Sequence, residues 1–175
     1  MRRTGFKKPT YNEAIKRLKV KSKKRISTKT NVSKKKPVKV KIKPLKAKLW
    51  ELCKQIIRLK YKNPNNTWNC YTCGKLIDEP AKAQTGHFLA SSVCGAYLRY
   101  DLRNLRIQDY YCNINLGGNG ATFYKNLVER EGQEYVDQIF KDKQKTIKAD
   151  EIWFTEKIKE YEEVLRVLQA NQQTL

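Results

Sequence analysis

The cysteines are the residues whose spacing most clearly indicates metal chemistry. Cys70 and Cys73 are separated by two residues and followed by a glycine, which is the pattern of half a zinc knuckle. A tight turn of this kind points both thiolates inward, and a closed zinc site needs four ligands. Cys112, with Asp109 three residues before it, can supply the second half, and Cys94 is the alternative to Asp109. The sequence therefore predicts a structural Zn²⁺ site at these residues.

The only histidine, His87, lies between the two halves of this knuckle, in the sequence Gly86-His87-Phe88. A lone histidine is usually structural or exposed, but imidazole titrates near neutral pH and can take a proton from water. Asn104 and Asn113 follow it along the chain, and an amide oxygen such as that of Asn113 can hold a divalent cation. Such a cation neutralises a scissile phosphate and the departing oxygen. These residues together favour phosphodiester hydrolysis, with His87 as the general base.

The spacing of apolar residues predicts the elements that position these side chains. Between Leu45 and Leu59 they recur every three or four residues, which indicates an amphipathic helix with Pro44 in its first turn and Cys53 as an ordinary core residue. Residues 65–77 are rich in turn formers. Further on we expect strands at 83–89 and 102–108, a loop over 90–99 between them, and helices at about 111–117, from the N-cap Asn119 to 132, at 133–141 and at 149–169. The last helix should pack on the core or on a second subunit.

The charge is concentrated in the first part of the chain. Residues 1–48 contain 20 Lys and Arg and a single acid, Glu13, for a net charge of +19, whereas the other 127 residues carry only +2. A block of this kind repels itself and binds polyanions by displacing their counterions. We therefore expect a disordered basic tail over residues 1–43, with a short helix near 12–18, and a folded domain over 44–175. The alternative is a tail that only aids solubility or touches a membrane surface.

Composition also argues against two other classes of protein. No run of 18 apolar residues could cross a membrane, and the positive N-terminus has no apolar segment behind it, so we expect neither a membrane span nor a secretory signal. Five cysteines, an odd number that includes a close pair, suggest a reducing compartment and a metal rather than disulfides.

The order of motifs between Leu49 and Gly132 resembles the NinG (Rap) recombination proteins of lambda-like phages. The shared motifs are Cys-x-x-Cys-Gly, Gly-His-Phe, Leu-Arg-Tyr-Asp-x-Arg-Asn, Gln-x-x-x-Cys-Asn, Gly-Gly-Asn and Tyr-x-x-Leu. More broadly the sequence resembles the HNH, or His-Me finger, nucleases, which share a β-hairpin followed by a helix around one divalent metal. The resemblance implies an α+β fold, with a small zinc-knuckle ββα-metal core flanked by helices.

The resemblance also implies roles for individual residues. His87 matches the general base, Asn104 the middle asparagine that steadies the histidine loop, and Asn113 the asparagine that binds a catalytic Mg²⁺ or Mn²⁺ ion. Many HNH nucleases have an acid before the histidine, where this chain has a glycine. The second protein ligand of that ion is therefore unassigned, with Asn119 and Asp101 as candidates.

On this basis we expect a metal-dependent DNA endonuclease that cuts branched recombination intermediates. Arg99, Arg103 and Arg106 could grip a flanking phosphate or equally be solvated charges at a strand edge. Because resolving a junction needs two cuts, a homodimer is attractive, and the resemblance implies a phage or prophage protein in the cytoplasm of a bacterial host. A zinc-stabilised nucleic-acid-binding protein without catalysis is the alternative function, and a basic RNA-binding protein of ribosomal type is a third.

Overall fold

The computed structural model describes residues 42–172 of the 175-residue chain. The expected basic tail, with its short helix near 12–18, lies almost entirely outside these residues. The described part is a mixed α+β structure, as predicted, with two small antiparallel sheets among helices. In chain order its elements are α2 (Ile42–Lys60), β1 (Trp68–Asn69), β2 (Leu76–Ile77), η1 (Pro80–Lys82), β3 (Ala83–His87), α3 (Ala96–Arg99), η2 (Leu102–Asn104), β4 (Leu105–Asp109), η3 (Tyr111–Asn115), α4 (Gly120–Glu131), α5 (Gln133–Asp142) and α6 (Glu151–Gln172).

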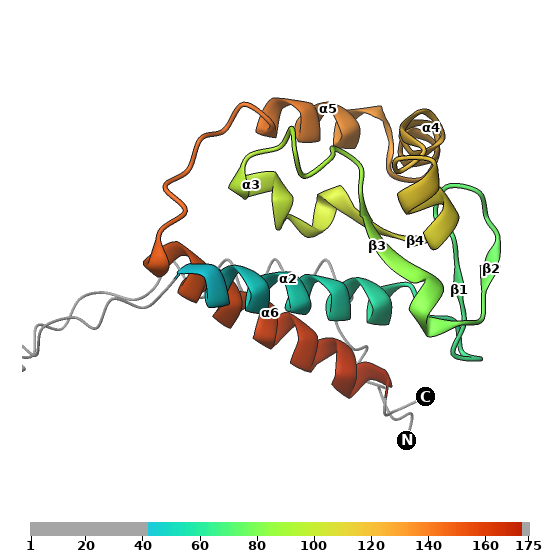
Figure 1. The fold of residues 1–175 in the computed structure, drawn as a ribbon, viewed down its shortest axis with the longest axis horizontal. Helices are drawn as coiled ribbons and strands as arrows, with labels where there is room; N and C mark the ends of the chain where they lie inside the picture. The colour runs from blue at the N-terminus through green and yellow to red at the C-terminus, as the bar shows by residue number, and fades with distance from the viewer. Residues whose placement is uncertain (1–41, 173–175) are drawn as a thin grey trace, which may run out of the picture.

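Two long helices, α2 and α6, pack along one another and form one layer of the structure (Figure 1). Each has one apolar face at helical spacing, so burying the two faces together removes both from water. The buried residues are Leu49, Leu52, Cys53, Ile56 and Ile57 on α2 and Phe154, Ile158, Tyr161, Val164 and Leu165 on α6. The last helix therefore packs on the core of its own chain. The first helix begins at Ile42, two residues before the predicted start, and Pro44 lies in its first turn.

The hairpin β3–β4 lies between the α2–α6 layer and the helices α3, α4 and α5 (Figure 1). Its register pairs His87 with Leu105 and the preceding Gly86 with Arg106. All five residues of β4 are buried, as expected for a strand covered on both faces. This strand was predicted to begin at Leu102, and that prediction is wrong. Residues 102–104 form a 3₁₀ turn, because the side chain of Asp101 accepts a hydrogen bond from the Arg103 N–H at 2.9 Å.

Three shorter segments also differ from the prediction. The expected loop over 90–99 contains the one-turn helix α3, the turn-rich segment contains the two-residue strands β1 and β2, and the helix expected at Tyr111 is a five-residue π-helical turn, η3. Asn119 stands at the N-cap of α4, but with a left-handed backbone (φ 50°) and no side-chain bond to the helix backbone. Its side-chain oxygen accepts the hydroxyl of Thr122 instead, at 3.0 Å. Asn119 therefore begins the helix by its backbone turn and not by side-chain capping.

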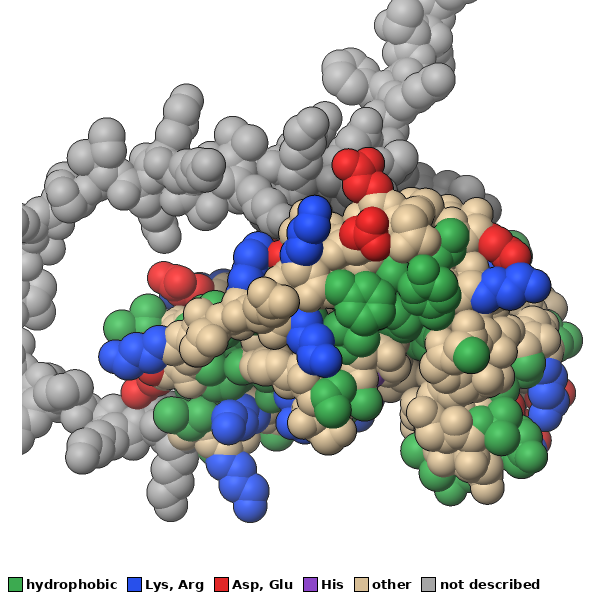
Figure 2. Space-filling view, turned by 90° about the horizontal axis from the view of Figure 1, so that it is seen from above, with side chains coloured by type: hydrophobic (Ala, Val, Ile, Leu, Met, Phe, Trp, Pro, Cys, Tyr) green, Lys and Arg blue, Asp and Glu red, His purple; other side chains and the backbone are tan. Residues whose placement is uncertain are grey.

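The surface of the described part carries charges of both signs. On the face seen from above in Figure 2, Lys and Arg side chains alternate with Asp and Glu side chains and with hydrophobic patches. No uniformly basic surface is seen on this face, in keeping with a net charge that is concentrated in residues 1–48. Among residues 42–172, no helix is both long and apolar enough to cross a membrane.

Candidate active site

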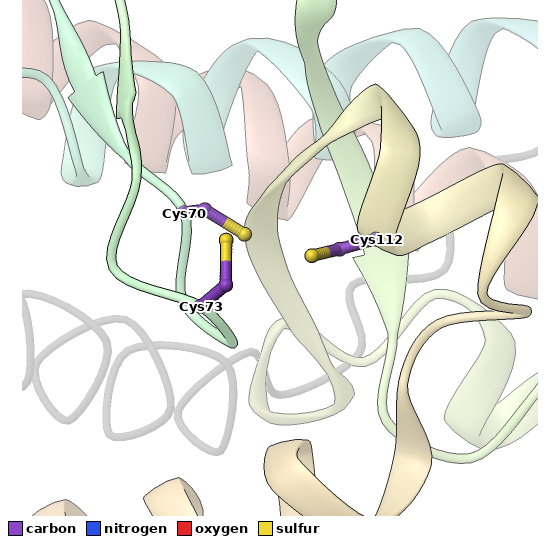
Figure 3. Close-up of side chains that lie close together, drawn as sticks. All are labelled: Cys70, Cys73 and Cys112. Atoms are coloured by element: carbon purple, nitrogen blue, oxygen red, sulfur yellow. The ribbon is translucent and has the colours of Figure 1, made fainter.

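Three of the predicted zinc ligands lie together. The Sγ atoms of Cys70, Cys73 and Cys112 are all within 4.8 Å of one another, and Figure 3 shows them directed into a common space. Zinc–sulfur bonds of about 2.3 Å in a tetrahedral site place sulfur atoms about 3.7 Å apart. The three thiols therefore fit one metal ion with little movement. They come from segments about 40 residues apart in the sequence, so a bound ion would tie these segments together.

The turn between β1 and β2 positions the first two cysteines. Gly74 closes it with a positive φ of 75°, a conformation that favours glycine, and its N–H donates to the Cys70 carbonyl at 2.9 Å. Burial opposes ionisation of the Cys70 thiol, but hydrogen bonds from the Thr72 hydroxyl and from the backbone N–H groups of Asp109, Cys73 and Thr72 outweigh it and lower its pKa. Donors gathered around one sulfur stabilise a thiolate, which is the form that binds metal.

Neither candidate for the fourth ligand belongs to this group. The carboxylate of Asp109 accepts a hydrogen bond from the Tyr111 N–H at 3.0 Å and lies 3.8 Å from the Lys75 ammonium. Asp109 thus shapes the segment that carries Cys112, and only its backbone N–H contacts the Cys70 sulfur. Cys94 packs in a separate apolar cluster with Leu98 and Ile139. Within the described residues the group that could hold a metal ion consists of these three cysteines, and the fourth ligand stays a prediction.

His87, at the end of β3, is half-buried and held on two sides. Its ring stacks on the indole of Trp50 from α2, and its Nε2 lies 3.0 Å from the backbone carbonyl oxygen of Arg99. A carbonyl can only accept, so Nε2 carries the proton and Nδ1 keeps its lone pair in the neutral ring. Burial lowers the pKa of His87, and the nearby charge of Arg99 adds to this, against the opposing effect of the carbonyl. The ring is therefore neutral at physiological pH, with a basic nitrogen available.

Asn104 fixes the loop that follows His87. It is fully buried, and its Oδ1 accepts the Leu89 N–H at 2.8 Å while its Nδ2 donates to the Leu89 carbonyl at 3.0 Å and to the Leu98 carbonyl at 3.2 Å. Its own backbone carbonyl accepts the Phe88 N–H at 2.8 Å. One side chain thus joins the loop after β3 to the helix α3, whose last residue, Arg99, holds the His87 ring.

Asn113 lies next to the residue that precedes His87. A Cβ on Gly86 would be 3.0 Å from Asn113 Oδ1 and would collide with the side chain of Gln108. Gln108 is completely buried, and its Nε2 donates to the Gly118 carbonyl at 2.8 Å and lies 3.3 Å from Thr72 Oγ1. Asn113 and Gln108 thus meet over Gly86. The sequence alone indicates no role for Gln108, although this residue stands first in the Gln-x-x-x-Cys-Asn motif.

The other two candidate metal ligands are engaged elsewhere. The Asp101 carboxylate receives the Arg103 guanidinium in a two-pronged ion pair, with contacts of 2.6 to 3.1 Å. The Asn119 oxygen is bonded to Thr122, and the three atoms nearest to a Cβ on Gly86 belong only to Gln108 and Asn113. The geometry therefore does not favour either as a partner of Asn113.

The three candidate arginines have different environments. Arg106 is fully buried, donates to backbone carbonyls and to Glu131 at 2.9 Å, and lies over the rings of Tyr61, Tyr71 and Tyr135. It cannot reach a phosphate at the surface and is not a solvated edge charge, so both expectations for Arg106 are corrected.

Arg103 is paired with both Asp101 and Asp142, so two carboxylates neutralise its charge. Arg99 is exposed and lines a cavity of about 430 Å³ together with Lys46 and Trp50. Of the three, Arg99 is the residue with its charge accessible beside His87.

Comparison with known proteins places the chain among phage proteins. The model of the family described as bacteriophage lambda NinG protein matches residues 3–171. The chain belongs to the NinG family. The NinG proteins of Escherichia phage 933W and Escherichia phage lambda are 36% and 34% identical to it over 70 residues, which are 40% of this chain and 33% of each relative.

The NinG protein of Salmonella phage P22 is 32% identical over 103 residues, or 57% of this chain and 47% of the relative. The matched segments thus span a third to a half of the length of these NinG proteins. No solved structure matches the chain.

Proposed function

We propose that this NinG-family chain is a metal-dependent DNA endonuclease with an HNH-type, ββα-metal active site. The observation that carries the proposal is the state of His87. Its Nε2 is tied to the Arg99 carbonyl, its pKa is lowered by burial, and Nδ1 has no hydrogen-bond partner among residues 42–172. In a domain that only binds nucleic acid, a histidine would need neither a fixed tautomer nor a lowered pKa. The hairpin β3–β4, followed by the segment with Asn113, supplies the two strands and the following turn of such a site.

In the proposed reaction, His87 Nδ1 takes a proton from a water molecule. The water oxygen then bonds to the scissile phosphorus as the bond from phosphorus to the departing oxygen breaks, and solvent protonates that oxygen. The Arg99 carbonyl fixes the tautomer, and the stacked Trp50 fixes the plane of the ring. Asn104 keeps the loop from moving by bonding both backbone groups of Leu89. A Mg²⁺ or Mn²⁺ ion held by Asn113 would supply charge neutralisation for the phosphate and the departing oxygen.

The cysteines hold a structural Zn²⁺ ion in this proposal. Cys112 directly precedes Asn113, so an ion bound by Cys70, Cys73 and Cys112 would anchor the η3 turn against the β1–β2 hairpin. The three cysteine sulfurs are donors that zinc prefers. Zinc would thus contribute to catalysis only through the position of Asn113.

We infer the substrate class from charge and from the family. The net charge of +19 over residues 1–48 favours binding to a polyanion. Exposed positive charge is added by Arg99 and Lys46, which line one cavity with Trp50, the residue stacked on His87. We extend the proposal to branched recombination intermediates, such as a Holliday junction or a D-loop, from the resemblance to the NinG (Rap) recombination proteins. A homodimer would make the paired cuts, in the cytoplasm of an infected bacterium.

A cleavage panel tests the proposal. Purified full-length protein is incubated with a four-way DNA junction, the matching linear duplex and an RNA duplex, each with Mg²⁺ and with chelator. We expect cleavage of the DNA junction that depends on Mg²⁺. Tight binding without cleavage under every metal condition would instead support a non-catalytic nucleic-acid-binding protein, and selective binding of RNA would support a ribosomal type of function.

A further inference from the structure

Gln108 has an unusual buried oxygen. Its side chain is completely buried, and its Oε1 has no hydrogen-bond partner among the residues that the structure describes. Buried side-chain oxygens nearly always have a partner, because leaving one without costs free energy. The other end of the same amide is satisfied by the Gly118 carbonyl at 2.8 Å. This bond fixes the orientation of the amide, since only Nε2 can donate, so the oxygen is held in place without a partner.

The unsatisfied oxygen lies against Gly86, the residue that precedes His87. Gln108 Oε1 is the atom nearest to the position of a Cβ on Gly86, and Asn113 Oδ1 lies 3.0 Å from the same point. Gly86 immediately precedes His87, and its φ is not positive, so the backbone does not require glycine there. What the position requires is space, because the side chain of Gln108 reaches across the hairpin and fills it. Two amide oxygens thus converge at the residue that precedes the histidine.

We propose that Gln108 Oε1 and Asn113 Oδ1 together bind the divalent cation, with Gln108 as the second protein ligand. Hard cations such as Mg²⁺ and Mn²⁺ prefer oxygen donors and retain several waters, so two amide oxygens and a phosphate suffice for a weak site. The inference rests on the proposed endonuclease function. It also explains why no side chain stands at position 86: Gln108, which is paired with Gln84 two residues earlier on β3, supplies the ligand in that space.

Thr72 links this site to the zinc knuckle. Its hydroxyl lies 3.2 Å from Cys70 Sγ and 3.3 Å from Gln108 Nε2. Gln108 is therefore held between the cysteine cluster and the Gly118 carbonyl. In this arrangement Thr72 is a positioning residue, which fixes the amide that presents Oε1 to the cation.

Mn²⁺ binding to zinc-loaded full-length protein tests the proposal directly. Free Mn²⁺ is measured by electron paramagnetic resonance for the wild type, Gln108→Leu, Gln108→Glu and the control Gln84→Leu, which replaces the neighbouring glutamine across the hairpin. We expect Gln108→Leu to weaken binding at least about tenfold, and Gln108→Glu, which keeps an oxygen, to bind as tightly as the wild type or more tightly. Gln84→Leu should have no effect.

A second pair of variants tests the role of space at position 86. Gly86→Ala places a Cβ against Gln108 and should weaken Mn²⁺ binding, whereas Gly120→Ala, where a Cβ meets no atom within 4 Å, should not. The double variant Gly86→Asp with Gln108→Ala returns an oxygen to the same space and should recover binding. Circular dichroism melts establish that each variant is folded.

The outcomes separate this inference from the function on which it rests. Wild-type binding of Mn²⁺ by folded Gln108→Leu would overturn the role of Gln108 and leave a cation held by Asn113 and the endonuclease intact. A wild-type protein that neither binds Mn²⁺ nor cuts DNA would overturn both. Loss of Mn²⁺ binding in Gln108→Leu together with its retention in Gln84→Leu is the result that supports the proposal.

Discussion

The imidazole of His87 lies almost parallel to the indole of Trp50, with ring centroids 5.0 Å apart and 9° between the planes. Trp50 belongs to α2, so the main apolar helix of the core covers one face of the proposed base. Because the indole excludes water from that face, it contributes to the burial that lowers the pKa of His87. The histidine is thus unprotonated at a lower pH than an exposed one.

This contact predicts the pH dependence of cleavage. A histidine acts as a general base only in its neutral form, so the rate should rise with pH through the pKa of His87 and level off above it. This rise is the acid limb of the pH–rate profile. Since the pKa of His87 is lowered, the midpoint of the wild-type acid limb should lie below the ordinary histidine pKa of about 6.5. Trp50→Leu exposes the ring, raises its pKa and should move the acid limb to higher pH. Single-turnover rates between pH 4.5 and 8.5 measure this shift.

The matched control is Trp153→Leu, which removes an indole that packs on Tyr100 and Phe154 and not on His87. Its acid limb should coincide with that of the wild type. If Trp50→Leu also left the limb unchanged, the stacked indole would have no influence on the base.

Zinc content tests the cysteine cluster. Elemental analysis of native protein should show about one zinc per chain, and Cys73→Ser should lose it and lower the melting temperature by about 5 °C or more. Cys94→Ala and Asp109→Asn should retain the zinc, because neither side chain belongs to the group. The opposite result would be a native protein that contains no metal and keeps the same melting temperature after Cys73→Ser. That result would mean that apolar packing alone holds the β1–β2 hairpin.

Arg106 should be essential for stability and not for phosphate binding. Its guanidinium is buried against Glu131, backbone carbonyls and three tyrosine rings, so truncation leaves these partners unsatisfied. Arg106→Ala should lower the free energy of unfolding by about 3–5 kcal/mol, measured by urea denaturation. Arg99→Ala should leave stability within about 0.5 kcal/mol and weaken DNA binding instead. A stable Arg106→Ala protein with selectively weakened DNA binding would reverse this assignment.

The basic N-terminal segment should supply affinity without selectivity. Each phosphate neutralised contributes a slope of about −0.9 to the dependence of log affinity on log salt for duplex DNA. Deletion of residues 1–41, which leaves α2 intact, should flatten this slope by several units for junction and duplex alike. Salt titrations of binding for both proteins on both DNAs measure it. A junction preference lost with the deletion would show that this segment reads DNA structure.

The sequence predicts those parts of the fold that depend on local pattern. The helices α2 and α6 follow from apolar residues at helical spacing, and the cysteine cluster follows from the Cys-x-x-Cys spacing with Cys112. The late start of β4 was not predictable in this way, because one hydrogen bond from Arg103 N–H to Asp101 decides it.

Other features depend on residues far apart in the sequence. A charged residue in a strand normally faces solvent, but tyrosines at positions 61, 71 and 135 enclose Arg106 from three separate segments. The same holds for the candidate site. His87 and Asn113 were identified from their motifs, whereas Gln108 emerges only when the hairpin places its amide over Gly86. Gly86 beside the proposed base indicates that another side chain could fill the space of its missing Cβ. The sequence does not indicate that Gln108 is the residue that does so.

The central claim is that His87 acts as a base on water and not as a DNA-binding group. The most direct measurement compares the wild type and His87→Ala on one four-way junction, with Mg²⁺, recording the single-turnover cleavage rate and the equilibrium affinity side by side. The account predicts a rate lower by about 10²–10⁴ with affinity nearly unchanged. Cleavage by His87→Ala at the wild-type rate would contradict it.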